Sequence, residues 1–240
     1  MLIIIIMKTT FTKIVLFTIF ISTAIMANAC QKQLSENSLQ EQENKSNKTS
    51  DLSGNLDVTP STNFVATSNL SEDEIAGLIF MKEEEKLARD VYSFLYTKWN
   101  AKIFNNISSS ENTHANAIIS LLKFYNNPDT TLQAVGLFNN KELQDLYTNL
   151  ISKGSISLVE AYKIGALIED LDISDLENYI NNTKNINIIS VLENLQKGSR
   201  NHIRSFTKQL NNLGVIYIPT YISQIEYNSI IASDMERGND

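Results

Sequence analysis

The stretch EEEKLARDVY, residues 83–92, decides the fold. It lies in a longer segment, from Ser71 to about Trp99, whose apolar side chains recur every three or four residues, as on one face of an α-helix. Glu85 occupies a position in this apolar stripe, where an aliphatic residue is expected. Because an unpaired buried charge is costly, this acid predicts a partner inside the protein core.

Helical periodicity continues along the rest of the chain, and no run alternates as a strand does. Capping-box sequences at Ser71-x-x-Glu74 and Ser157-x-x-Glu160 indicate two helix starts. We expect long helices at about residues 71–99, 109–125, 157–172 and 187–214, and short helices at 141–153, after Ser174 and after Ser223. These lengths predict an all-α protein, an up-down four-helix bundle with a long crossover connection and short extra helices.

Ionisable residues interrupt the apolar stripes of the other three long helices as well. They are Glu111 and His114 in the second, Glu169 in the third and His202 in the fourth. The chain has two histidines, and both fall on these stripes. Glu111-x-x-His114 places both side chains on one helix face, one turn apart. A divalent metal ion is the simplest partner that carboxylates and imidazoles share in a core, so the pattern predicts a metal site.

Several positions have a second interpretation. Glu84 competes with Glu85 as the ligand from the first helix, and a run of acids such as residues 83–85 is usually a solvated face. Glu111 follows Ser108 by three residues, the spacing of a capping box, and His202 alone is compatible with a structural core histidine.

The motifs resemble those of the ferritin-like superfamily. Glu85-x-x-Ala88-x-x-x-Tyr92 is similar to its first-helix pattern, Glu111-x-x-His114 to its second, and Glu169 to its third. The fourth helix departs from the pattern, since Ser199-Arg200-Asn201-His202 keeps the histidine and lacks the carboxylate. From Leu70 to about Ile231 the chain resembles an uncharacterised prokaryotic branch of that superfamily, a domain of unknown function.

The resemblance implies a carboxylate/histidine site for one or two iron ions, with manganese as the other candidate. It implies oxidase, peroxidase or iron-oxidising chemistry with a small oxidant such as dioxygen or peroxide, and a separate electron donor. The superfamily's two-metal sites use about six protein ligands. Asp172, one turn after Glu169, is the candidate for the sixth.

The N-terminal residues predict export. Lys8 and Lys13 precede an apolar run at residues 14–26, and Ala27-Asn28-Ala29 fits a cleavage signal, so residues 1–29 are interpreted as a signal peptide. Cys30, the sole cysteine, is then the predicted site of lipidation, residues 30–69 a flexible linker and residues 70–240 the folded domain. This predicts an exported, membrane-anchored lipoprotein on the periplasmic side or cell surface; cleavage alone predicts a soluble secreted protein.

Charge excludes one class of partner. Without residues 1–29 the chain carries 18 basic and 27 acidic residues, which argues against nucleic acid. Two functions remain: an iron-dependent oxidoreductase, or a non-catalytic surface-anchored helical binding or structural module. In the second, the inward acids pair with Arg89, Arg200 and Arg204.

Overall fold

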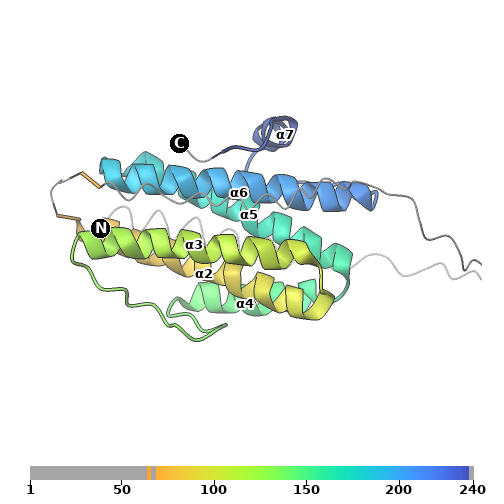
Figure 1. Cartoon of the computed structure of the whole chain (residues 1–240), viewed down its shortest axis with the longest axis horizontal. Helices are drawn as coiled ribbons and strands as arrows, with labels where there is room; N and C mark the ends of the chain where they lie inside the picture. The colour runs from red at the N-terminus through yellow and green to blue at the C-terminus, as the bar shows by residue number, and fades with distance from the viewer. Residues whose placement is uncertain (1–63, 66–68, 238–240) are drawn as a thin grey trace, which may run out of the picture. The chain divides into compact units, whose positions relative to one another are not determined.

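A computed structural model of the chain describes residues 64–65 and 69–237. This part is all α-helical, with six helices and no strand (Figure 1). The predicted signal peptide, Cys30 and nearly all of the predicted linker lie outside the described residues. None of the described helices has the length and hydropathy that crossing a membrane requires. The helices are α2 (Glu72–Trp99), α3 (Lys102–Phe124), α4 (Lys141–Gly154), α5 (Leu158–Asn182), α6 (Ile186–Asn212) and α7 (Gln224–Ala232).

Side-chain caps start most of these helices where the sequence predicts. Ser71 accepts a hydrogen bond from the Glu74 amide, and Glu74 accepts one from the Ser71 amide, which is the complete capping box. Asn140 caps α4 and Ser157 caps α5 through their side-chain oxygens. The bounds of α4 and α6 agree with the prediction to within two residues, and α7 follows Ser223 as expected.

The four long helices pack as two pairs. α2 lies along α3, and α5 lies along α6; α3 also contacts α6, and α2 contacts α5 (Figure 1). The crossover between α3 and α5 carries α4, which packs on α2 and α5. Each long helix therefore presents one face to an interior shared with the other three.

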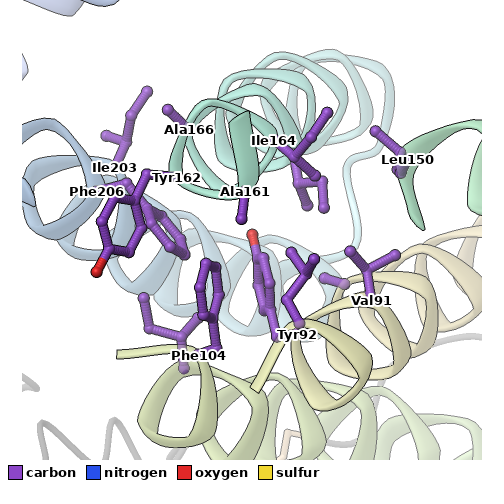
Figure 2. Close-up of a cluster of buried hydrophobic side chains, with 14 of the residues drawn as sticks. Val91, Tyr92, Phe104, Leu150, Ala161, Tyr162, Ile164, Ala166, Ile203 and Phe206 are labelled. Atoms are coloured by element: carbon purple, nitrogen blue, oxygen red, sulfur yellow. The ribbon is translucent and has the colours of Figure 1, made fainter. Parts of the chain in front are cut away.

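Two apolar clusters fill this interior and leave a polar layer between them. One contains Met81 of α2 and Leu195 of α6. The other contains Ala88 and Tyr92 of α2, and Figure 2 shows the Tyr92 ring among side chains from α3, α5 and α6. Glu85 falls between the clusters along α2. Apolar packing on both sides therefore fixes the helices that carry the acids.

Two predicted boundaries are wrong. α3 begins at Lys102 instead of about residue 109, because Asn100 in the left-handed conformation ends α2 and only Asn100 and Ala101 separate the helices. α5 continues to Asn182 without a new helix at Ser174. The buried apolar residues that flank Ser174 pack in the core, and this packing overrides the local capping signal.

The acidic run of α2 is buried rather than solvated. Glu83, Glu84 and Glu85 are 2%, 6% and 1% exposed. Glu83 accepts hydrogen bonds from the amides of Asn139 and Asn140 at the start of α4. The crossover segment thus covers this face of α2, which removes it from solvent.

The segment after α6 is held by a single carboxylate. Asp170 of α5 accepts hydrogen bonds from the Tyr217 hydroxyl and from the amides of Thr220, Tyr221 and Ile222. These bonds fasten residues 217–222 against α5 and place the Tyr221 side chain beside the polar layer.

Candidate metal centre

The predicted ligands of α2 and α3 meet in the polar layer. Nδ1 of His114 lies 2.8 Å from Oε2 of Glu111 and 3.2 Å from Oε2 of Glu85. All three side chains are at most 2% exposed. We call Glu85, Glu111 and His114 the His114 group; their donor atoms lie within 4.8 Å of one another, close enough to hold one metal ion.

A second group of three shares Glu111. Nδ1 of His202 lies 2.9 Å from Oε1 of Glu111 and 3.3 Å from Oε2 of Glu169. We call Glu111, Glu169 and His202 the His202 group, which also fits one ion. Glu111 turns one oxygen to each histidine, and the two imidazole rings lie 5.6 Å apart, centroid to centroid. Glu111 is therefore the residue that the two groups share.

Several donor atoms of the two groups have no hydrogen-bond partner among the described residues. Oε1 of Glu111 and Nδ1 of His202 are close, yet among the described residues neither atom has a partner with hydrogen-bond geometry. Oε1 of Glu85 is likewise buried and unpartnered. Buried polar atoms normally find partners, so unpartnered atoms in two groups with metal-binding spacing fit metal ions as the missing partners.

Protonation is strongly perturbed within both groups. Burial opposes the charge on Glu111, but His202 and His114 outweigh it and hold its pKa far below the usual value. Burial also opposes the charge on His202, yet Glu111 and Glu169 raise the pKa of His202 to about 10. Burial and the neighbouring Glu111 raise the pKa of Glu169 to about 7. Without metal, the charges therefore depend on one another for compensation.

Asp172 lies beside both groups but belongs to neither. Ser199 donates a hydrogen bond from Oγ to Oδ2 of Asp172. Burial, then repulsion from Glu169, raises the pKa of Asp172 to about 8. Ser199 stands where a fourth-helix carboxylate was expected, so Asp172 reaches from α5 toward the position that α6 leaves without an acid.

Surrounding residues fix the orientation of the histidines. Ser110 Oγ lies 3.1 Å from Nε2 of His202, which leaves Nδ1 for the cluster. Gly198 of α6 gives the His114 ring its room, because a Cβ at that position would lie 2.5 Å from both Cε1 and Nε2 of His114. The need for Gly198 arises from helix packing and has no signal in the sequence.

Tyr92 supports the other end of the site. Its hydroxyl donates to Oε1 of Glu169 at 2.5 Å and also contacts the Gly165 carbonyl. Burial and the adjacent Glu169 raise the pKa of Tyr92, which keeps the hydroxyl a proton donor. The Tyr92 ring packs in an apolar cluster, whereas its hydroxyl belongs to the polar layer.

The structure contradicts two alternative interpretations of these residues, a capping-box role for Glu111 and ion pairs between the inward acids and arginines. Ser108 lies inside α3, where its hydroxyl bonds to Ser93 and to the Arg89 carbonyl, so Glu111 is no capping-box residue. Arg200 and Arg204 pair with Glu236 rather than with Asp172. Arg89 pairs with its neighbour, Asp90. None of these arginines pairs with the clustered acids in the described part of the chain, so the prediction that arginines neutralise the inward acids is wrong.

Sequence analysis missed one acid near the site. Asp175 follows Asp172 by three residues, a spacing that places it on the same face of α5. After burial, Asp175 is the neighbour that most raises the pKa of Glu84, and Glu84 is not part of the His114 group. The first-helix residue of the cluster is Glu85.

A small cavity of about 20 Å³, room for one water-sized molecule, reaches the acids from the α4 side. Leu143, Leu146 and Leu150 of α4 form an apolar wall. The lining also includes Glu85, Glu111, Glu169 and Asp172.

The fold and site define a class: an all-α protein whose buried carboxylate/histidine groups could hold metal ions. The chain belongs to the family described as an uncharacterised protein domain, DUF2202, whose model matches residues 74–234.

The chain is also similar to a protein with a solved structure. The chain is 55% identical over 170 residues to uncharacterised protein MJ0754 of Methanocaldococcus jannaschii, across 70% of this chain and 92% of the relative. The crystal structure of hypothetical protein MJ0754 from Methanococcus jannaschii matches with a TM-score of 0.70 at 53% identity. That match covers 72% of this chain and 99% of the solved chain.

Proposed function

We propose that this protein is a ferritin-like metalloprotein. In this proposal α2, α3, α5 and α6 form an up-down four-helix bundle with a long crossover that contains α4. Its polar layer binds two metal ions, one in the His114 group and one in the His202 group, with Glu111 as the bridge. The observation that carries the proposal is the sharing of Glu111 between two buried three-residue groups.

Iron suits this donor set best, and manganese is the alternative, because both accept carboxylate and imidazole ligands together. Asp172 completes a set of six side chains, which is the usual number for two-ion carboxylate sites in bundles. Bound iron supplies one-electron redox chemistry toward a small oxidant such as dioxygen or peroxide. We propose oxidase, peroxidase or iron-oxidising activity, with electrons from a separate donor.

The residues around the ions have separate tasks. Ser110 and Gly198 set the rotation of the two imidazoles. Tyr92 holds Glu169 and offers a proton at its hydroxyl oxygen. The leucines of α4 line the small cavity, which has room for one water-sized molecule beside the acids. Small size and apolar lining favour a small oxidant in this proposal.

Export and anchoring remain part of the proposal. We propose that residues 1–29 are removed, that Cys30 carries the lipid, and that the domain acts at the periplasmic side or cell surface. The residues concerned lie outside the described range, and the sequence pattern alone supports this.

Metal analysis tests the function. Protein purified aerobically and reconstituted with Fe²⁺ should retain at least one firmly held ion and show oxo-iron absorption in the near ultraviolet. Glu111→Gln should reduce the bound iron sharply because both groups lose the bridge. The matched control is Glu193→Gln, which removes the same charge from an exposed position of α6. Wild-type protein that holds no metal after reconstitution overturns the proposal in favour of a non-catalytic module.

A further inference from the structure

A pair of acids outside both metal groups lies beside the centre. Glu84 of α2 and Asp175 of α5 lie near one another, and after burial Asp175 is the neighbour that most raises the pKa of Glu84. Oε2 of Glu84 and Oδ2 of Asp175 have no hydrogen-bond partner in the part of the chain that the structure describes. The Glu84 side chain is buried and lines the small cavity, whereas Asp175 is partly exposed.

The pair is continuous with the centre. On α5, Glu169, Asp172 and Asp175 follow at three-residue intervals, which places them along one helix face. Asp172 is near enough to Glu84 and Glu85 to raise the pKa of both after the larger effect of burial. The cavity is lined by Glu84, Asp172 and Tyr221 and also by the carboxylates of the centre.

The positive charges closest in sequence to Glu84 are engaged elsewhere. Lys82 reaches Thr131 and Asp129 of the crossover, and Lys86 pairs with Asp90. The acids thus form a continuous row from the partly exposed Asp175 to the buried groups, and the lysines beside Glu84 make their ion pairs elsewhere.

We propose that Glu84 and Asp175 form a transit site for divalent cations, through which ions pass by way of Asp172 to the metal centre. The inference rests on the proposed function, since it names the route by which that centre is filled. Two carboxylates hold a hydrated divalent cation loosely, with water as the remaining ligands. Among the described residues, groups with three convergent donors occur only in the centre, so the pair binds weakly and releases its ion inward.

The test compares the rate of loading with the final amount bound. Metal-free full-length protein is mixed with Co²⁺, and binding is followed by stopped-flow visible absorption and by equilibrium dialysis. Asp175→Asn and Glu84→Gln should each slow loading about 10-fold, because acidic funnels raise association rates by 10-fold or more. The equilibrium stoichiometry should stay at the wild-type value. Higher salt should slow the wild type more than either variant.

Glu193→Gln is the control for loss of one negative charge, and its loading rate should equal that of the wild type. Both route variants are used, so that poor folding of one leaves the other to decide. A wild-type loading rate in a folded variant refutes the route while leaving the centre intact. Loss of stoichiometry in both variants refutes it too, since the pair then belongs to the centre. Wild-type protein that binds no Co²⁺ overturns route and centre together.

Discussion

Replacing Asp172 with asparagine is expected to stabilise the metal-free protein, and the same change at Asp170 is expected to destabilise it. Both side chains are buried carboxylates on α5, two residues apart. Asp170 is surrounded by donors, namely one hydroxyl and three amides. Asp172 receives one hydroxyl bond, and repulsion from Glu169 and Glu111 adds to burial in raising its pKa, with His114 as a smaller opposing charge. Because their surroundings are opposite, the two substitutions should change the free energy of unfolding in opposite directions.

The magnitude for Asp172 follows from its pKa. The folded value is about 8, against 3.8 for an unperturbed aspartate. Folding at pH 7 must therefore protonate a group that is ionised in the unfolded chain. At about 1.36 kcal/mol per pKa unit, a span of roughly three units costs on the order of 4 kcal/mol. Relaxation of the neighbours reduces this, so Asp172→Asn should gain about 2–4 kcal/mol, or roughly 10 °C in Tm for a domain of this size.

The stabilisation expected from Asp172→Asn depends on pH. An acid with a raised folded pKa contributes full stability below its unfolded pKa and loses it as pH rises toward its folded pKa. The advantage of Asp172→Asn should therefore shrink as pH falls from about 8 toward about 4. Asp170→Asn should lose about 3 kcal/mol or more, because charged hydrogen bonds to buried donors disappear.

Urea unfolding of metal-stripped protein, followed by circular dichroism at several pH values, measures both effects. Added Fe²⁺ should stabilise the wild type more than Asp172→Asn, since the variant lacks the sixth side chain. A destabilised metal-free Asp172→Asn at pH 8 contradicts the view that this residue is held in a repulsive, metal-ready site. A stabilised Asp170→Asn contradicts the account of the C-terminal anchor.

Three further outcomes are expected. Gly198→Ala should displace His114 and weaken Fe²⁺ binding at least 10-fold by isothermal titration, whereas Gly154→Ala, whose Cβ meets Leu95 instead, should leave affinity unchanged. Raising the pH from 6 to 9 should lower the Tm of the metal-free protein, since the pKa values of Glu169 and His202 are raised to about 7 and about 10. The same change should increase metal affinity, because protons that compete with the metal leave the ligands. Equal slopes of Tm against pH with and without metal contradict this. Cys30→Ser should abolish lipid labelling and release the protein from membranes; a wild type that takes up no label refutes the anchor.

Local patterns predicted the elements of this protein because local forces produce them. The Ser71 box, the Asn140 cap and the three-four spacing of apolar residues act within one or two turns, and they place the helices to within a few residues. Acids and histidines in apolar stripes identified five residues that the structure brings together, because burial of such groups without compensation is too costly to be accidental.

Tertiary structure decided what depends on other segments. Ser174 sits in a helix-start sequence but continues α5, since its neighbours Ile173 and Leu176 gain more from the core than a cap provides. The run at residues 83–85 is buried because the crossover covers it, and only that packing separates Glu85, in the centre, from Glu84, near Asp175. The sequence thus determined which residues are buried and on which face of each helix they lie, because both follow from the spacing of apolar residues along the chain. Which atoms meet depended on the approach of helices distant in sequence, and that approach is set by packing.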